Sequence, residues 1–191
     1  MKTFTELPAE KLVPAGPITA RFLALGVPDF REAARYLLSL PYGRTSDRAD
    51  VTLVLNEGRG TCSSKHALLA QLAAEQRVPV TLTLGIYEMT EANTPGAGRI
   101  LASHGLSSLP EAHCYVVHSG RRVDITRSGK EPAEPITRFL HEEIIRPEQV
   151  GKYKEAVHRR FLTQWLTSMP GGRTPEEVWR IREECIAALG Q

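Results

Sequence analysis

The chain has few cysteines, no long apolar run and no excess of charge of one sign. Its three cysteines are an odd number in different sequence contexts, which argues against a disulfide framework and favours a reducing compartment. Cysteine pairs at metal-binding spacing are also missing, so we expect no metal site and no cofactor. These absences exclude a disulfide-stapled scaffold and a site built from Cys-x-x-Cys motifs.

Charge and hydropathy set further limits on partners and location. The 24 basic and 22 acidic residues nearly cancel, and a net charge of +2 implies neither nucleic acid nor a membrane surface as a partner. The segment from Met1 to Pro8 lacks the apolar core of a signal peptide, and no apolar run approaches membrane-spanning length. We therefore expect a cytoplasmic protein. With 191 residues, 41% of them hydrophobic, the chain can bury a proper core, so we expect a single domain.

The segment 58–69 has the composition of a loop that leads into a helix. Gly58 and Gly60 allow a sharp turn, small hydroxyl residues follow, and apolar residues then recur at helical spacing as far as Arg77. The turn delivers Cys62 to the start of the helix, where unpaired backbone N–H groups and the helix dipole favour a thiolate. Cys62 is therefore a candidate nucleophile. The alternative is that it is a small apolar residue in a helix cap.

Two β-prone runs, residues 112–118 and 121–126, predict a β-hairpin. Ser119-Gly120 lies between them and has the composition of a two-residue turn. With that turn, the register places Val116 opposite Val123. A three-residue turn would shift the register, so every inference about the faces of the hairpin depends on the turn.

The predicted register brings a histidine and an aspartate together. Side chains alternate along a strand, so His113 and Asp124 point to the same face of the hairpin. They are diagonal neighbours at about 7 Å between α-carbons, within reach of each other's side chains. A carboxylate in that place can orient an imidazole. The opposite face is expected to be core and carries Cys114, Val116, Val123 and Ile125.

The chain thus offers a nucleophile, a base and an orienting carboxylate for a thiol-based acyl transfer, in the order Cys62, His113, Asp124. His66 is the competing base, because it follows Cys62 by four residues and can lie on the same helical face. We prefer His113, since a histidine in the nucleophile's own helix points along that helix and has no carboxylate placed beside it. Lys65 can stabilise the thiolate, although an exposed lysine is more often simply solvated. The backbone N–H of Cys62 would be one donor of an oxyanion hole.

Four segments of the chain resemble the transglutaminase-like superfamily, a papain-like group with a Cys-His-Asp triad: Gly60–Leu69, Thr81–Tyr87, Ala112–Val116 and Val123–Thr126. The resemblance covers about residues 36–128. It implies Cys62 as nucleophile, His113 as general base and Asp124 as the residue that orients the histidine. Where the family usually has an aromatic residue directly after the histidine, this chain has Cys114.

The resemblance also implies the fold and the activity. The fold class would be α+β, with a papain-like core in which the nucleophile helix packs on an antiparallel sheet, and with extra helices at both ends. Within one domain over residues 1–191, the core would span about 28–128 and a C-terminal helical extension about 136–190. The candidate substrate contacts are Tyr42, Arg59, Tyr87 and Tyr115.

The implied activity is thiol-dependent acyl transfer or hydrolysis at an amide, as in a cysteine protease, an amidase or a transglutaminase. The substrate would be a peptide or another amide-containing molecule. Spacing in the sequence does not separate water from an amine as the acyl acceptor. The alternative is a non-catalytic binding or scaffold protein that retains the transglutaminase-like fold.

Capping residues and periodicity predict the other regular elements. Asp29 begins a helix that extends to Leu40, and Thr174 begins a last helix with proline at its first position. Residues 148–169 carry a helical stripe, and residues 80–87 are expected to form a strand beside that of His113.

Three segments have a less regular pattern. Residues 1–17 are broken by proline and glycine and predict an irregular surface lead-in. Residues 88–109 predict a long surface loop or a disordered insertion. Residues 51–55 have two possible structures: their composition favours a strand, whereas the resemblance favours a short helical turn.

Overall fold

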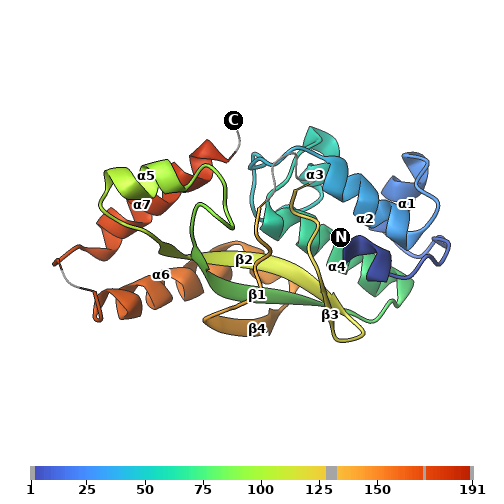
Figure 1. Ribbon diagram of the computed structural model, residues 1–191. Helices are drawn as coiled ribbons and strands as arrows, with labels where there is room; N and C mark the ends of the chain where they lie inside the picture. Colours follow the sequence, from blue (N-terminus) through green and yellow to red (C-terminus); the bar gives the residue numbers. More distant parts are fainter. Residues whose placement is uncertain (1–2, 128–132, 170, 190–191) are drawn as a thin grey trace. The chain divides into compact units, whose positions relative to one another are not determined.

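The computed structural model describes residues 3–127, 133–169 and 171–189, and predictions that concern the other residues lie outside these ranges. The side chains of residues 3 and 4 are likewise outside the description. Along the chain the elements are η1 (Thr3–Glu6), α1 (Pro17–Ala24), α2 (Phe30–Ser39), α3 (Leu53–Glu57), α4 (Cys62–Gln76), β1 (Val80–Met89), α5 (Gly98–Ser103), β2 (Leu109–His118), β3 (Arg121–Val123), β4 (His141–Ile145), η2 (Pro147–Val150), α6 (Lys152–Leu166) and α7 (Pro175–Ala188) (Figure 1).

The strands form one antiparallel sheet in the order β3-β2-β1-β4, with helices packed on it. This arrangement confirms the α+β class, while the papain-like core stays a prediction. The sequence did not predict β4, which lies where a helical extension was expected to begin. Two of its five residues, Glu142 and Glu143, are charged, and charged side chains are common in a short edge strand.

The chain divides into two compact units. The first unit comprises the described residues of Met1–Leu84, Cys114–Ser128 and Glu143–Gly151, and the second comprises those of Gly85–His113, Gly129–Glu142 and Lys152–Gln191. β1 and β2 each contribute residues to both units. The expectation of a single domain over residues 1–191 stays a prediction.

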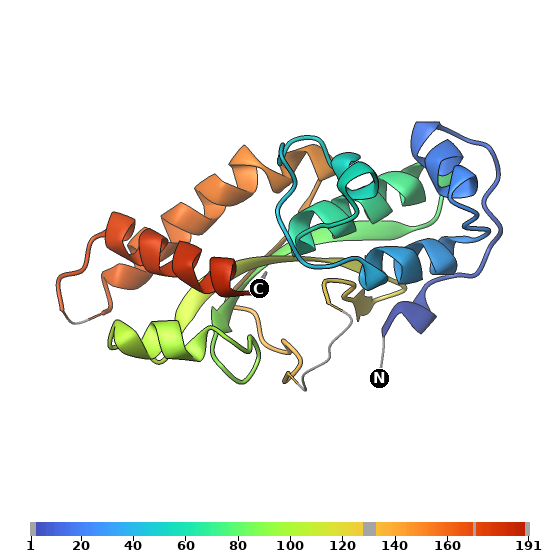
Figure 2. The same cartoon turned by 90° about the horizontal axis from the view of Figure 1, so that it is seen from above.

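In the first unit, α4 contacts α1, α2, α3 and η2 (Figure 2). Most of its side chains are buried, including Leu68, Leu69 and Leu72. A helix that is buried nearly all round forms the centre of a core rather than one wall of it. The helix begins after Thr61, whose side chain and that of Ser64 form a capping box.

Helix α1 was not predicted from the sequence, because a distant residue caps its N-terminus. The backbone N–H groups of Ile18 and Thr19 and the hydroxyl of Thr19 all donate to the carboxylate of Glu75 in α4. Burial raises the pKa of Glu75, but these hydrogen bonds outweigh it, and the pKa is lowered overall. Nothing local to α1 supplies this cap.

The hairpin has the predicted register. Val116 pairs with Val123, and the two residues of the turn, Ser119 and Gly120, both have positive φ, of 49° and 75°. Positive φ at both positions is typical of a two-residue turn of type I′. The predicted strand over 121–126 was too long, however, since β3 ends at Val123.

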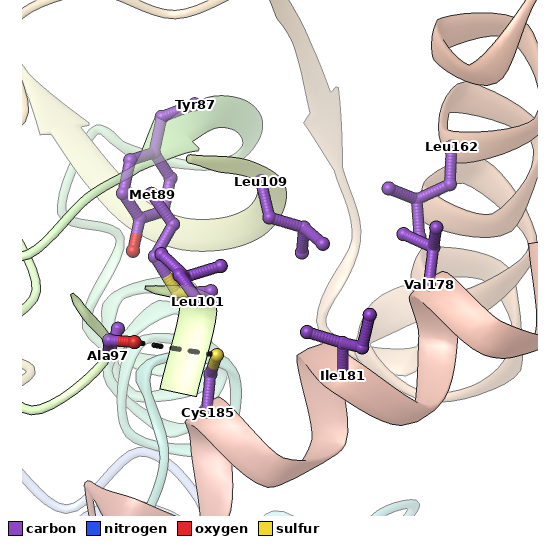
Figure 3. Packing of buried hydrophobic residues seen from close by; sticks show 9 residues of the cluster. All are labelled: Tyr87, Met89, Ala97, Leu101, Leu109, Leu162, Val178, Ile181 and Cys185. Atoms are coloured by element: carbon purple, nitrogen blue, oxygen red, sulfur yellow. Dashed lines mark hydrogen bonds between the residues drawn. The ribbon is translucent and has the colours of Figure 1, made fainter. Parts of the chain in front are cut away.

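The second unit has its own apolar core (Figure 3). Its buried members come from β1, β2, α5, α6, α7 and the chain before α5, and they are Tyr87, Met89, Ala97, Leu101, Leu109, Leu162, Val178, Ile181 and Cys185. The thiol of Cys185 points at the backbone oxygen of Ala97, 4.0 Å away. Burial raises the pKa of this thiol to about 11. Its predicted role in core packing is confirmed.

In three segments the structure corrects a prediction or decides between two alternatives. Residues 88–109 are not a plain surface loop, because they contain α5, which buries Leu101 completely. Residues 51–55 lead into α3, so the helical alternative was correct. The N-terminal lead-in is not confined to the surface either, since Leu7 and Leu12 are buried.

Candidate active site

Cys62 is the first residue of α4, and its side chain is 7% exposed. The loop before it passes close to the helix, because a Cβ added to Gly60 would lie 2.8 Å from Cγ of Lys65. Gly60 also pairs with the chain after α2: its N–H donates to the oxygen of Pro41, and its own oxygen accepts from Gly43, both at 3.2 Å. The predicted glycine turn into a helix start is therefore confirmed, and it holds Cys62 at a positive helix end.

His66 lies in the interior of the first unit, and backbone groups occupy both of its ring nitrogens. Nδ1 donates to the backbone oxygen of Cys62 at 2.7 Å, and Nε2 accepts from the N–H of Ile125 at 2.8 Å. These partners require a neutral ring with its proton on Nδ1. These two bonds direct neither ring nitrogen at the sulfur of Cys62. The expectation that no carboxylate lies beside His66 was wrong, because an oxygen of Asp124 lies 3.7 Å from its Nε2. The preference for His113 as base stays a prediction.

Asp124 follows β3 directly and is brought to the nucleophile helix. One of its carboxylate oxygens accepts from the N–H of Thr126 at 2.9 Å and lies 3.7 Å from Nε2 of His66. The same histidine binds the backbone oxygen of Cys62. His66 thus lies between the backbone of Cys62 and the carboxylate of Asp124, within the first unit. The side chain of Asp124 is 42% exposed.

His113 lies on β2 in the second unit, and its side chain is largely buried, at 7% exposed. The ring of Tyr87 meets the ring of His113 edge to face, with 5.9 Å between centroids. The hydroxyl of Tyr87 is in turn hydrogen-bonded to that of Thr94 at 2.8 Å. Since the boundary between the units falls directly after His113, the contacts of His113 with Cys62 and Asp124 stay predictions.

The four candidate substrate contacts fall into two groups. Tyr87 and Tyr115 are buried, which favours a packing role over contact with a substrate. The ring of Tyr115 is also covered by the guanidinium of Arg122, 5.5 Å from its centroid.

The other two candidates, Tyr42 and Arg59, lie in two loops that precede α4 in the chain and pair with each other. The guanidinium of Arg127 lies 5.0 Å from the ring centroid of Tyr42, and Arg59 forms an ion pair of 2.8 Å with Glu57. The side chain of Arg59 is half exposed. Their contact with a substrate stays a prediction.

The sequence did not indicate where the side chain of Lys65 lies. The sequence leaves open whether Lys65 stabilises the thiolate or is an exposed, solvated lysine, and the structure excludes exposure because it buries the residue completely. The sequence does carry a signal for this, because residues 67–74, which follow it in the same helix, are apolar except for Gln71, and a helix that is apolar nearly all round is buried.

The described part of the chain holds no group of three or more His, Cys, Asp or Glu residues placed to bind a metal ion. Likewise, none of the helices among the described residues is long and apolar enough to cross a membrane.

Comparisons with protein families, with curated proteins and with solved structures gave no significant match to this chain. The resemblance to the transglutaminase-like superfamily therefore stays a prediction.

Proposed function

We propose that this protein is a thiol-dependent enzyme that cleaves or transfers an acyl group at an amide bond. Cys62 is the nucleophile, His113 is the general base and Asp124 orients the base. The observation that carries the proposal is that His66 connects the backbone of Cys62 to the segment of Asp124, although the two lie far apart in the sequence. A nucleophile at a helix start and a carboxylate held beside that helix are two parts of an acyl-transfer site.

The first half of the reaction makes a thioester. The Cys62 thiolate attacks the carbonyl carbon of the amide, a C–S bond forms, and the carbonyl oxygen takes the negative charge. The backbone N–H groups at the start of α4 stabilise that oxyanion. His113, which has taken the proton of the Cys62 thiol, then gives it to the nitrogen of the leaving amine, the C=O bond re-forms and the C–N bond breaks. The acyl group is now held on sulfur.

The second half releases the acyl group to an acceptor. His113 removes a proton from water or from an amine, which attacks the thioester carbonyl, and the C–S bond breaks with return of the thiolate. Water gives hydrolysis, as in a protease or amidase, and an amine gives transfer, as in a transglutaminase. Asp124 stabilises the imidazolium that forms in each half.

Trapping the acyl-enzyme tests the proposal. The wild-type protein is incubated with activated acyl amides and esters, quenched in acid and analysed by intact mass and peptide mapping. We expect one acyl adduct, on Cys62, which is lost in Cys62→Ala and retained in Cys114→Ser. The buried Cys185 is an internal control, since burial keeps its thiol protonated.

Adding water alone or a primary amine to the trapped protein then distinguishes hydrolysis from transfer. Loss of the adduct with formation of an amide of the added amine identifies a transferase. Binding of amide ligands without any adduct on Cys62 would contradict the proposal and favour the scaffold alternative.

A further inference from the structure

The ammonium group of Lys65 is held inside the first unit by two backbone oxygens. It donates to the oxygen of Leu40 at the end of α2, at 2.6 Å, and to the oxygen of Thr126, at 2.9 Å. The whole residue is buried. A fully buried lysine is rare, because removing an ammonium from water is costly, so its retention needs a reason beyond packing.

Lys65 holds the segment that carries Asp124. The N–H of Thr126 binds the Asp124 carboxylate, while the oxygen of Thr126 accepts from Lys65. The neighbouring residue in the chain, Ile125, is bound by His66. Lys65 and His66, which are consecutive in α4, therefore form hydrogen bonds to Thr126 and Ile125, which are consecutive in this segment. The same helix begins with Cys62.

The charge of Lys65 is also linked to the same groups. Burial lowers the pKa of Lys65 to about 8, while the carboxylate of Asp124 and the thiolate of Cys62 raise it, and the guanidinium of Arg127 lowers it. Linkage is reciprocal, so an ammonium that the thiolate stabilises must stabilise the thiolate by the same free energy. His66 also faces this cluster, since its Nε2 lies 3.7 Å from an oxygen of Asp124.

We propose that Lys65 is a positioning residue of the Cys62 site, which fixes Asp124 beside α4 and whose ammonium stabilises the Cys62 thiolate. This inference rests on the proposed function of Cys62. It differs from a purely structural role, in which Lys65 would hold the segment but leave the titration of the thiol unchanged.

The test compares alkylation of Cys62 by iodoacetamide across pH in the wild-type protein and in three variants. Lys65→Met keeps much of the side-chain length but removes the charge, and Lys65→Arg keeps the charge. Lys154→Met is the matched control, because it removes another buried lysine, in the second unit. We expect Lys65→Met to raise the midpoint of the Cys62 profile by about one pH unit, so that alkylation at pH 6 is about tenfold slower. Lys65→Arg and Lys154→Met should keep the wild-type midpoint.

A second measurement needs no change at Lys65. The ε-carbon NMR signal of Lys65 should titrate near the lowered pKa of about 8 in the wild-type protein. In Cys62→Ser its midpoint should fall, because the thiolate that raises it is gone. An unchanged midpoint would overturn the electrostatic role of Lys65, even if the Lys65 variants do not fold.

The two proposals fail in different ways. If wild-type Cys62 reacts no faster than a free thiol, the proposed function is contradicted. If wild-type Cys62 is reactive at low pH and Lys65→Met leaves that profile unchanged, only the role of Lys65 is overturned.

Discussion

At the scale of single residues, the proposed reaction gives Cys62, His113 and Asp124 different roles, which substitutions can separate. Cys62→Ala should abolish turnover, because no other group takes the acyl chain. His113→Ala should cost nearly as much, and the double variant should be hardly worse than either single one, since members of such a unit are not additive. Asp124→Asn should retain more activity than either, because it removes orientation and charge but neither nucleophile nor base. Steady-state kinetics on an acyl-amide substrate measure all four.

Asp50→Asn is a matched control for Asp124→Asn. Asp50 accepts from the N–H of Thr52, two residues on, at 2.9 Å, the same turn that Asp124 forms with Thr126. The control should turn over at the wild-type rate. A folded Asp124→Asn variant with that same rate would show that Asp124 has no part in the reaction.

A buried ion pair dominates the electrostatics of the second unit. Arg182 donates to both carboxylate oxygens of Glu111, at 2.7 and 2.5 Å, and Nε2 of His158 lies 3.9 Å from that carboxylate. Burial raises the pKa of Glu111, but Arg182 and His158 outweigh it and lower the pKa to about 2. Burial also lowers the pKa of His158, against the opposing effect of Glu111.

The second unit should therefore lose stability in acid. A lowered folded-state pKa means that the unfolded chain binds more protons, so the free energy of unfolding falls as pH falls. The contribution of His158 to the free energy of unfolding is lost as pH falls below about 6.5. The contribution of Glu111, at most roughly 3 kcal/mol, is lost between about pH 4.5 and 2. Denaturant unfolding at a series of pH values measures it, and a flat profile from pH 7 to 3 would contradict the account.

Removing one partner of this pair should be costly at neutral pH. Glu111→Gln leaves the Arg182 guanidinium buried without its carboxylate, and we expect a loss of about 3–5 kcal/mol. Glu155→Gln is the control, since Glu155 and Arg159 form a half-exposed pair in α6 that is worth at most about 1 kcal/mol. Equal losses in the two variants would show that the Glu111 pair is not the stronger one.

At the scale of elements, helices with a local start signal or a long apolar stripe could be predicted from the sequence, as α6 was from its stripe. Asp29 and Thr174 each cap the helix that they were expected to begin, and Thr61 caps the helix that was expected to start at Cys62. In contrast, α1 depends on Glu75, which no local pattern connects to it. The edge strand β4 has too little apolar character to stand out.

The candidate site was predictable to a similar extent. The glycine turn, the helix start at Cys62 and the hairpin register all follow from short-range rules and agree with the structure. The burial of Lys65 and the two backbone bonds of His66 depend on where the segment after β3 meets α4, and that meeting is set by packing across the unit.

Removing the capping box of α4, and that of α7 as a control, tests whether the start of α4 affects the reactivity of Cys62. Thr61→Ala and Thr174→Ala each remove a capping box, from α4 and α7, and each should cost about 1 kcal/mol of stability. Only Thr61→Ala should also slow alkylation of Cys62, because it loosens the turn that presents the thiol. A Thr61→Ala variant that is destabilised but alkylated at the wild-type rate would contradict this role of the cap.

At the scale of the whole molecule, β1 and β2 connect the folding of the two units, since each strand contributes residues to both. We expect one cooperative unfolding transition. Fluorescence of Trp165 and Trp179 reports on the second unit, and the accessibility of Cys62 in denaturant reports on the first. The two midpoints should coincide in urea. Separate midpoints would show that the units are independent domains.

The central claim is that His113 activates Cys62. The most direct measurement is the rate of Cys62 alkylation by iodoacetamide from pH 4 to 10, in the wild-type protein and in His113→Ala, with adducts assigned by peptide mapping. The account predicts that wild-type Cys62 reacts well below the pH at which a free thiol ionises, near 8.5. It also predicts that His113→Ala moves the midpoint up by about one unit or more, because the imidazolium that stabilises the thiolate is gone. Identical profiles for the two proteins would contradict the claim.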